Sequence, residues 1–543
     1  MSSGIFKIEM PKNEPILSYA PGTPERAEIK AKLEELKSRV IEIPVISGGK
    51  EYWSNETVDI VIAHNHKHVL AKAHLANRET LQEAISNALE AKQRYLELPW
   101  DERASLFMRA ADLISGPWRA TLNAATMLCL SKTVYEAEID SACELIDMLR
   151  FNTYWMSEIY QQQPISSKDV WNRLEYRPLD GFVLAITPFN FASIAGNLPT
   201  APAIMGNVVI WKPASNALYP AYFIMKVLEE AGVPEGVINF VPVKSSLIDE
   251  VVLDHPDLGG VHFTGSTNTM KHIWRRIGEN IDKYKQYPRI VGETGGKDFV
   301  FAHKSTDIDA LVAALIRGAF EYQGQKCSAA SRAYIPKSMW PQVKEKLFRE
   351  IRTIEVGDPA DFTNFMAAII DKAQFDKIVS YIKQAKEDSN YEILCGGTYD
   401  DVVGYFVQPT VVLSKDPKAK LMSEEIFGPV LTIYLYDGEK HEETLKLCDE
   451  TSSYGLTGSI FATDREALTI AERILRFAAG NFYRNDKPTG AVIAQQPFGG
   501  SRGSGTNDKA GSFLNLLRWT SVRTIKENFV PPTDYRRPFM AEP

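Results

Sequence analysis

A cysteine in a turn of small residues is the clearest candidate for chemistry in this chain. Cys327 stands in Gln323-Gly324-Gln325-Lys326-Cys327-Ser328-Ala329, between a predicted helix over 307–320 and a strand-like segment over 333–336. A thiol is a strong nucleophile when it ionises near neutral pH, and nearby cations such as Lys326 favour that ionisation. The alternative is a small buried hydrophobe, the common role of a free cysteine. This stretch alone does not decide between the two.

Polar residues also follow predicted strands. Asn190 follows a predicted strand that ends near residue 186, and Lys212 and Ser215 follow one that ends near residue 211. The turn Thr264-Gly265-Ser266-Thr267 follows a third, which ends near residue 263. An asparagine amide can stabilise an oxyanion. Lysine and serine suit ribose hydroxyls, and backbone N–H groups in a turn that opens a helix can bind a phosphate. Each signal is weak alone, because such turns are common and the turn is not G-x-G-x-x-G.

A glutamate flanked by glycines follows a later predicted strand. Glu293 lies in Gly292-Glu293-Thr294-Gly295-Gly296-Lys297, at the boundary between two α/β regions. A carboxylate in a cleft at that boundary is a candidate general base. A structural turn is the alternative for any one such glutamate.

The elements that must position these residues alternate between strand and helix after residue 181. Repeated βα units of this kind predict a parallel, doubly wound sheet, which binds ligands at the carboxyl ends of its strands. Amphipathic helices are predicted over 80–96 and 101–115, followed by one long helix over 133–160 that carries Glu144. A lone helical glutamate is most often solvated. Residues 171–176 predict a strand that could form a projecting hairpin with nearby residues.

Composition excludes several classes of protein. The 543 residues carry a net charge of −8 with both signs scattered, so neither nucleic acid nor a membrane surface is an expected partner. Five widely spaced cysteines, without CxxC or HExxH, predict neither a disulfide framework nor a metal site. The first 15 residues have the character of neither a signal nor a transit peptide, and no run of 18 apolar residues exists. A bacterial source predicts a cytoplasmic protein, and a mitochondrial matrix protein is expected only if a leader has been removed.

Taken together, the motifs resemble those of the aldehyde dehydrogenase superfamily. The segments that carry this resemblance are Pro188-Phe189-Asn190-Phe191, Thr264-Gly265-Ser266, Glu293-Thr294-Gly295-Gly296-Lys297, Gly324-Gln325-Lys326-Cys327 and Glu425-Ile426-Phe427-Gly428-Pro429, in that order. The likeness is closer still to the branch that oxidises glutamate γ-semialdehyde. That closer likeness is carried by Phe320–Ala329, Gly480-Asn481-Phe482-Tyr483, Asn485-Asp486-Lys487, Gln495–Gly500 and Ser504–Lys509.

The resemblance implies an α/β aldehyde dehydrogenase fold. Its parts are a Rossmann-like NAD domain (1–160 and 181–295), a catalytic domain (296–502) and a β-flap for oligomerisation (161–180 and 503–543). Cys327 is the implied nucleophile, Glu293 the base that activates water, and Asn190 an oxyanion donor. NAD is the implied cofactor. The implied cofactor residues are Thr187, Lys212, Ser215, Gly265, Ser266, Thr267, Asn268, Thr269, Thr294, Glu425 and Phe427.

The same resemblance implies how the substrate is held. Ser328 and the loop residues Gly490 and Ala491 match the positions that bind the substrate's carboxylate and amine. Some members carry serine where Ala491 stands, so one hydroxyl is missing here. Phe191 and Phe498 are expected to flank the aliphatic stem, although core packing is their ordinary role. Glu144 and Lys326 are expected near the substrate.

The expected function is NAD-dependent oxidation of L-glutamate γ-semialdehyde to L-glutamate, the second step of proline degradation. We expect a homodimer or higher homo-oligomer that is functionally coupled to a separate proline dehydrogenase. The nearest rival is another semialdehyde dehydrogenase, for example one acting on succinate semialdehyde. A catalytically silent NAD-binding protein is a second rival, which the joint presence of Cys327, Glu293 and Asn190 disfavours. A fused DNA-binding regulator is set aside, because the chain has no room for a proline oxidase or a basic module.

Overall fold

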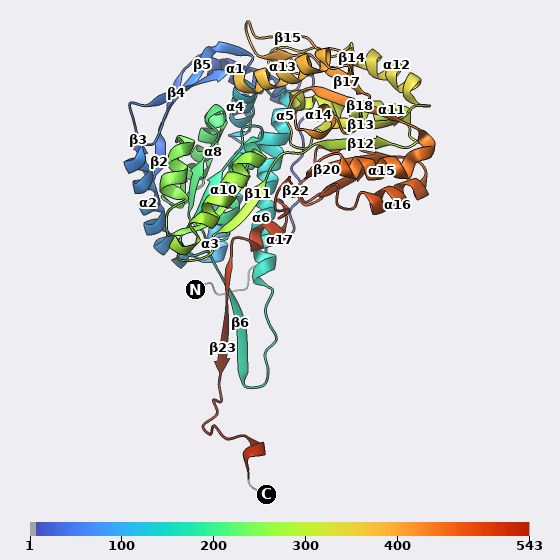
Figure 1. Cartoon of the computed structure of the whole chain (residues 1–543). Helices are drawn as coiled ribbons and strands as arrows, with labels where there is room; N and C mark the ends of the chain where they lie inside the picture. The colour runs from blue at the N-terminus through green and yellow to red at the C-terminus, as the bar shows by residue number, and fades with distance from the viewer. Residues whose placement is uncertain (1–6, 542–543) are drawn as a thin grey trace.

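The computed structural model describes residues 7–541. Two α/β bodies, each built on a seven-stranded sheet, lie side by side, and a two-stranded projection extends below them (Figure 1). Within residues 7–541, no helix is both long and apolar enough to cross a membrane.

The first sheet has the spatial order β11-β10-β7-β8-β9-β2-β3. Its strands are β11 (Arg289–Glu293), β10 (Leu258–Thr264), β7 (Phe182–Ile186), β8 (Val209–Lys212), β9 (Ile238–Phe240), β2 (Val45–Ser47) and β3 (Lys50–Tyr52). The pairs from β11 to β9 are parallel, whereas β2 and β3 pair antiparallel. All seven residues of β10 are buried, as expected for a parallel strand covered on both faces. The strand predicted over 182–186 is confirmed at those residues.

Helices pack beside this sheet. They are α2 (Arg78–Glu97), α7 (Ala192–Ile204), α8 (Leu218–Glu230) and α10 (Thr267–Glu279), while α3 (Trp100–Ser115) packs on α6 (Leu145–Tyr160), α7 and α8. Strand β7 lies between β8 and β10. From β7 the chain builds the sheet in one direction through β8 and β9, and it then crosses over to add β10 and β11 on the other side of β7. The carboxyl ends of β7 and β10 therefore form the switch point at which such sheets bind ligands.

The second sheet has the order β14-β17-β18-β13-β12-β20-β21 and is parallel except for β14. Its strands are β14 (Tyr391–Cys395), β17 (Thr410–Ser414), β18 (Val430–Tyr436), β13 (Ala330–Pro336), β12 (Asp298–Ala302), β20 (Thr457–Phe461) and β21 (Asn481–Arg484). The helices of this body are α11 (Ile308–Phe320), α12 (Trp340–Ile351), α13 (Lys372–Glu387), α14 (Lys420–Ser423), α15 (His441–Glu450) and α16 (Arg465–Ile474).

The two sheets meet at a short connection. β11 ends at Glu293, and β12 begins at Asp298. The carboxyl edge of the first sheet therefore faces the amino edge of the second. Asp298 pairs in register with Ala330 at the start of β13, so the turn before β13 is brought to the same junction. This geometry places Cys327 close to Glu293.

The long helix predicted over 133–160 is interrupted. It consists of α5 (Val134–Ala137), a π-helical segment η1 (Glu138–Glu144) and α6 (Leu145–Tyr160). A π-turn inserts an extra residue into the helix, and such turns are frequent at functional sites. Here the π-turn ends at Glu144.

The projection joins distant parts of the chain. β6 (Val170–Arg177) pairs antiparallel with β23 (Ser521–Asn528), so the hairpin with nearby residues was a wrong prediction. The strand signal at 170–177 was local, but the partner strand lies at the other end of the sequence. Residues 503–520, including α17 (Phe513–Leu517), pack against the two bodies rather than on the projection.

The remaining elements surround this frame. They are α1 (Pro24–Lys37), α4 (Arg119–Leu130), a sheet of β1 (Ile41–Ile43), β5 (Asn65–His74) and β4 (Thr57–Ile62), α9 (Ser245–Leu247), and the pairs β15 (Tyr399–Asp400) with β16 (Phe406–Val407) and β19 (Tyr454–Gly455) with β22 (Ser501–Arg502).

Candidate active site

The turn that carries Cys327 is conformationally strained. Helix α11 ends at Phe320, and the next residues include Tyr322, Gln323 and Gly324, whose φ values are 51°, 55° and 65°. Left-handed backbone is costly for the two residues that carry a Cβ. The Gln323 side chain stabilises the turn by donating to the carbonyl oxygens of Ser131 (3.0 Å) and Ala368 (2.9 Å). The predicted tight turn is thus present, with two positive-φ residues that are not glycine.

Cys327 and Glu293 face each other. The Cys327 thiol donates to Glu293 Oε1 at 3.7 Å. Burial raises the pKa of Glu293 to about 7. Burial, and then the Glu293 carboxylate, raise the pKa of Cys327 well above its usual range. A carboxylate of near-neutral pKa beside a protonated thiol is suited to take its proton or to orient a water.

The prediction that Lys326 lowers the pKa of the neighbouring thiol is wrong. Its ammonium instead binds Glu136 Oε2 at 3.1 Å and Glu321 Oε2 at 3.5 Å. Burial alone would lower the pKa of Lys326, but these two carboxylates raise it. Adjacent residues in a turn point in different directions, so closeness in sequence did not bring the cation to the sulfur.

Asn190 lies in the loop after β7 and is buried. Its side-chain amide donates to the backbone carbonyl of Gln325, two residues before Cys327, at 3.1 Å. The amide thus contacts the turn that carries the nucleophile.

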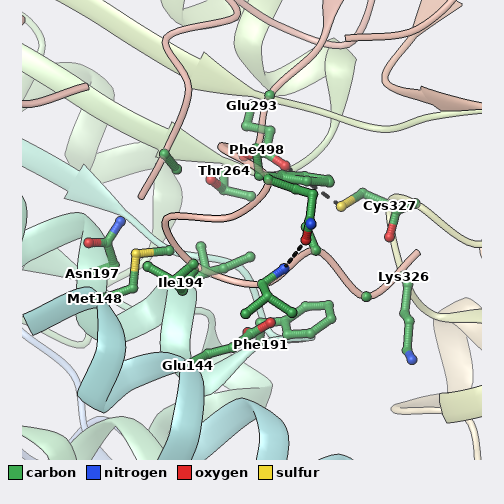
Figure 2. A pocket seen from close by; sticks show the side chains of 18 of the residues that line it. Glu144, Met148, Phe191, Ile194, Asn197, Thr264, Glu293, Lys326, Cys327 and Phe498 are labelled. Carbon is green, nitrogen blue, oxygen red and sulfur yellow. Dashed lines mark hydrogen bonds between the residues drawn. The ribbon is translucent and has the colours of Figure 1, made fainter. Parts of the chain in front are cut away.

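A cavity of 640 Å³ opens beside these groups. It is lined by two of the three predicted catalytic residues, Cys327 and Glu293, whereas Asn190 is not among its lining residues. Figure 2 shows Cys327 and Glu293 with several of the other lining side chains. All residues predicted to bind substrate also line it, namely Glu144, Phe191, Lys326, Ser328, Gly490, Ala491 and Phe498. The two phenylalanines are only partly buried and form cavity wall, rather than being fully buried in the core.

Glu144 is not the solvated helix residue that its sequence context favoured. It forms part of the cavity wall and accepts a hydrogen bond from Ser193 Oγ at 2.9 Å. Burial, and then the nearby Asp140 carboxylate, raise its pKa to about 8. The Glu144 carboxyl therefore keeps its proton to higher pH than an exposed glutamate does.

Ser328 contacts the loop that carries Gly490. Its hydroxyl shares a hydrogen bond of 2.7 Å with Thr489 Oγ1. Gly490 has a φ of 88°, a conformation that favours glycine. The serine next to the nucleophile and the loop 489–496 thus form one continuous side of the cavity.

The predicted cofactor residues of the first sheet lie along its carboxyl edge. Thr187 follows β7, Lys212 ends β8, residues 265–269 follow β10, and Thr294 follows β11. Ser215 begins a short 3₁₀ turn, and Ser266 caps α10 by accepting from the N–H of Thr269 (3.1 Å). Trp211 Nε1 donates to the Thr187 hydroxyl at 3.2 Å. Burial lowers the pKa of Lys212, whose ammonium donates to the carbonyl of Pro213 (3.3 Å).

Glu425 and Phe427 reach this edge from the second body. Glu425 Oε1 accepts from the N–H of Gly296 at 2.9 Å, in the connection between the two sheets. The rings of Phe427 and Phe189 pack edge to face with centroids 5.8 Å apart. Both residues therefore lie where the two bodies meet.

Comparison with known proteins agrees with this arrangement. The model of the aldehyde dehydrogenase family matches residues 53–525. This chain belongs to the aldehyde dehydrogenase family.

Individual relatives of this aldehyde dehydrogenase are similar over their whole length. The mitochondrial Δ1-pyrroline-5-carboxylate dehydrogenase of Dictyostelium discoideum is 52% identical over 99% of this chain and 97% of its own. The human mitochondrial protein of that name is 47% identical over 97% and 94%. The crystal structure of the Mycobacterium tuberculosis Δ-pyrroline-5-carboxylate dehydrogenase bound with NAD is 52% identical, covers 100% of both chains and has a TM-score of 0.96.

Sequence reasoning missed several residues of this aldehyde dehydrogenase site. Thr489 and Lys509 lie within or beside quoted motifs, but nothing in their types suggested contact with Ser328 or an electrostatic effect on Glu293. Asn13 and Asp147 also line the cavity, and they carry no local signal at all. Among residues 7–541, no group of three or more His, Cys, Asp or Glu side chains is placed to hold a metal ion.

Proposed function

We propose that this chain oxidises L-glutamate γ-semialdehyde, the open form of Δ1-pyrroline-5-carboxylate, to L-glutamate with reduction of NAD. This reaction is the second step of proline degradation. The proposal rests on the pairing of Cys327 with Glu293, whose Sγ and Oε1 atoms lie 3.7 Å apart at the wall of a 640 Å³ cavity. Full-length relatives named for this reaction, one of them solved with NAD, support it.

Cys327 acts as the nucleophile. The thiol gives up its proton to water, and the sulfur attacks the aldehyde carbon to give a thiohemiacetal. The oxyanion accepts hydrogen bonds from the Asn190 amide and from the backbone N–H of Cys327. After loss of hydride the thiohemiacetal becomes a thioester. Glu293 then activates a water that releases the acid and restores the thiol.

NAD accepts the hydride when it is bound, and the residues along the carboxyl edge of the first sheet are suited to hold it. Lys212 carries an ammonium that is largely buried against a carbonyl, a setting suited to a ligand that brings hydroxyl groups. The start of α10 offers backbone N–H groups to a pyrophosphate. Glu425 and Phe427 stand on the nicotinamide side. The other residues proposed here are Thr187, Ser215, Gly265, Ser266, Thr267, Asn268, Thr269 and Thr294.

Substrate recognition rests on the side of the cavity that Ser328 and the loop 489–496 form. Ser328 and the backbone of Gly490 and Ala491 bind the carboxylate through directed hydrogen bonds, which are strong when the acceptor is charged. Phe191 and Phe498 enclose the aliphatic stem. Glu144 faces the same cavity and suits a substrate ammonium, which succinate semialdehyde lacks.

We also propose the organisation and assembly of the chain. Residues 1–160 and 181–295 form the NAD domain, 296–502 the catalytic domain, and 161–180 with 503–543 the flap and its connection. The flap leaves Trp171 and Val522 49% and 45% exposed, so we infer that a second copy covers it in a homodimer or larger homo-oligomer.

The partner and the compartment follow from the substrate. A separate proline dehydrogenase would supply pyrroline-5-carboxylate. Supporting this coupling, the solved proline utilization A of Bdellovibrio bacteriovorus is 29% identical over 96% of this chain and 54% of its own, with a TM-score of 0.91. We propose a cytoplasmic location if the source is bacterial. We propose the mitochondrial matrix only if a leader has been removed, and relatives such as the human protein are named as mitochondrial.

Initial rates test the function. Pyrroline-5-carboxylate, succinate semialdehyde and propanal are compared, each with NAD and with NADP. The proposal predicts the highest kcat/KM for pyrroline-5-carboxylate with NAD. A higher kcat/KM for succinate semialdehyde would reassign the substrate.

A further inference from the structure

A segment near the N-terminus forms part of the cavity wall. Residues 13–19 have no helix or strand of their own, and Asn13, Glu14 and Ile16 line the cavity. We call this segment the N-terminal strap. It lies against α4, η1 and α6, so its position depends on side-chain contacts rather than on a sheet.

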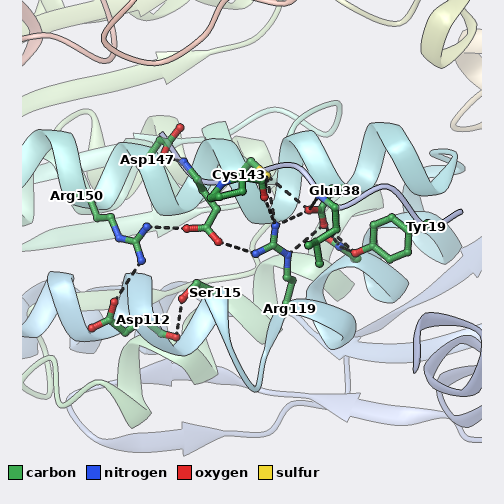
Figure 3. Close-up of polar contacts among 12 residues, drawn as sticks. Tyr19, Asp112, Ser115, Arg119, Glu138, Cys143, Asp147 and Arg150 are labelled. Carbon is green, nitrogen blue, oxygen red and sulfur yellow. Dashed lines mark hydrogen bonds and ion pairs between the residues drawn. The ribbon is translucent and has the colours of Figure 1, made fainter. Parts of the chain in front are cut away.

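Partly buried ion pairs fix the middle of the strap. The Glu14 carboxylate binds Arg119 Nη1 and Arg150 Nη1, each at 2.7 Å, and its side chain is only 11% exposed. Arg119 also donates to the carbonyl of Pro15 at 2.8 Å. Figure 3 shows the two arginines within this network of polar contacts. Removing one partner of such a pair leaves the other charge buried without compensation, so the strap is firmly held.

The C-terminal end of the strap is fixed by one carboxylate. Glu138 Oε1 accepts from the N–H of Leu17, and Glu138 Oε2 accepts from the Tyr19 hydroxyl, each at 2.8 Å. Arg119 forms an ion pair with the same carboxylate. The strap therefore has a rigid base from which its first residue, Asn13, can act.

Asn13 joins three separate parts of the chain. Its amide nitrogen donates to Asp147 Oδ2 on α6 at 2.8 Å and to the backbone carbonyl of Ile493 at 2.9 Å. Its amide oxygen accepts from Gln495 Nε2 at 2.9 Å. An asparagine can donate and accept at once, and here both capacities are used.

The loop that Asn13 contacts carries the proposed carboxylate site. Residues 489–496 form no helix or strand. The loop is held to the body by the buried Ile493, which packs with Met148 and Phe151, and by polar contacts at its two ends. Thr489 binds Ser328 at the start of the loop, and Asn13 binds Ile493 and Gln495 near its end. Gly490 and Ala491 lie between these two attachments.

We propose that Asn13 is a positioning residue that sets substrate specificity by holding the loop 489–496 in the geometry that binds a carboxylate. This inference rests on the proposed function, since it names a residue that prepares the same substrate site. Asn13 acts through the loop and not on the reacting atoms. Losing it affects substrates with a carboxylate and spares simple aldehydes.

The first test is a split of kinetic constants. In Asn13→Ala we expect KM for pyrroline-5-carboxylate to rise about fivefold to tenfold, because two hydrogen bonds to the loop are lost, with kcat changed less than about twofold. KM for propanal should stay within about twofold, because propanal has no carboxylate. Ser18→Ala is the matched control. Its exposed hydroxyl lies on the same strap and, among residues 7–541, accepts only from the nearby N–H of Ala20 (3.3 Å), so this variant should resemble wild type.

The second readout does not depend on the substrate. Hydrogen–deuterium exchange of the peptide that covers residues 489–496 should be faster in Asn13→Ala and unchanged in Ser18→Ala. Gln495→Ala should give a smaller rise in KM, because it removes only one of the two hydrogen bonds between Asn13 and the loop. The double variant should show less than the product of the two effects, since both variants remove the contact between Asn13 and Gln495.

Two outcomes would overturn the inference. One is an unchanged KM for pyrroline-5-carboxylate in Asn13→Ala. The other is an equal rise for propanal with unchanged exchange in the loop, which would mean that Asn13 acts on the nucleophile or the fold. If wild-type enzyme does not oxidise pyrroline-5-carboxylate, the proposed function fails. The exchange experiment still decides whether Asn13 holds the loop.

Discussion

Replacing Glu293 by glutamine should stabilise the protein at alkaline pH. Burial raises the pKa of this carboxyl from its ordinary 4.5 to about 7. Below pH 4.5 the group is protonated in both the folded and unfolded states. Between 4.5 and about 7 the folded state keeps a proton that the unfolded state releases, so stability falls as the pH rises. Above pH 7 the buried carboxyl is ionised in the folded state as well, and the full cost of that ionisation to the free energy of unfolding is on the order of 3 kcal/mol.

A glutamine at this position has the same shape and never ionises. It can still accept from the Cys327 thiol, so packing should be conserved. For a chain of this length, 3 kcal/mol corresponds to about 2–3 °C in the melting temperature, from the usual unfolding entropy per residue. We expect Glu293→Gln to melt higher than wild type by about that amount at pH 8, and by less than about 1 °C at pH 5.

Thermal melts at fixed protein concentration measure this difference, because assembly changes the apparent melting temperature. Glu387→Gln, on the exposed end of α13, is the matched control and should melt like wild type at both pH values. The reasoning is refuted if Glu293→Gln melts no higher than wild type at pH 8. It is equally refuted if the gain is the same at pH 5, since packing rather than ionisation would then be responsible.

Three further outcomes are expected. Cys327→Ala should abolish aldehyde oxidation while NAD affinity, measured by calorimetry, stays close to wild type; residual turnover near the wild-type rate would exclude covalent catalysis here. Ser328→Ala should raise KM for pyrroline-5-carboxylate about tenfold and leave propanal unaffected; equal weakening of both would assign the serine to the nucleophile's turn. Lys132 is fully buried, and its ammonium binds Asp140 at 2.7 Å and lies 4.0 Å from the centroid of the Phe191 ring. Lys132→Met should therefore lower the free energy of unfolding, measured with denaturant, by about 3–5 kcal/mol, because the Asp140 charge is left buried without its partner. A decrease below about 1 kcal/mol would contradict this.

Much of the frame could be predicted because its signals are local. The apolar run 182–186 predicted β7 at its observed bounds, since a parallel strand must be apolar on both faces. The helix predicted over 307–320 is α11, with Asp307 as its cap. Residues placed after strands or at turns, such as Asn190, Glu293 and Cys327, meet because the two sheets join edge to edge.

The predictions that failed concern the direction of side chains and contacts between residues far apart in the sequence. The sequence could not show that Lys326 turns toward Glu136 and Glu321, because side-chain direction in a turn is set by tertiary contacts. The helical pattern over 133–160 did not reveal the π-turn before Glu144. Asn13 was missed for a different reason. Its partners lie more than a hundred residues away, and an asparagine in a coil segment carries no periodic signal.

The central claim is that Cys327 forms the thioester and Glu293 is needed to hydrolyse it. The most direct measurement mixes Glu293→Gln with NAD and pyrroline-5-carboxylate in a stopped flow, and quenches samples for mass spectrometry. We expect a burst of NADH followed by a slow steady state, with a glutamyl adduct on the peptide that contains Cys327. An absent burst with slowed hydride transfer, or NADH formation without an adduct on that peptide, would contradict this claim.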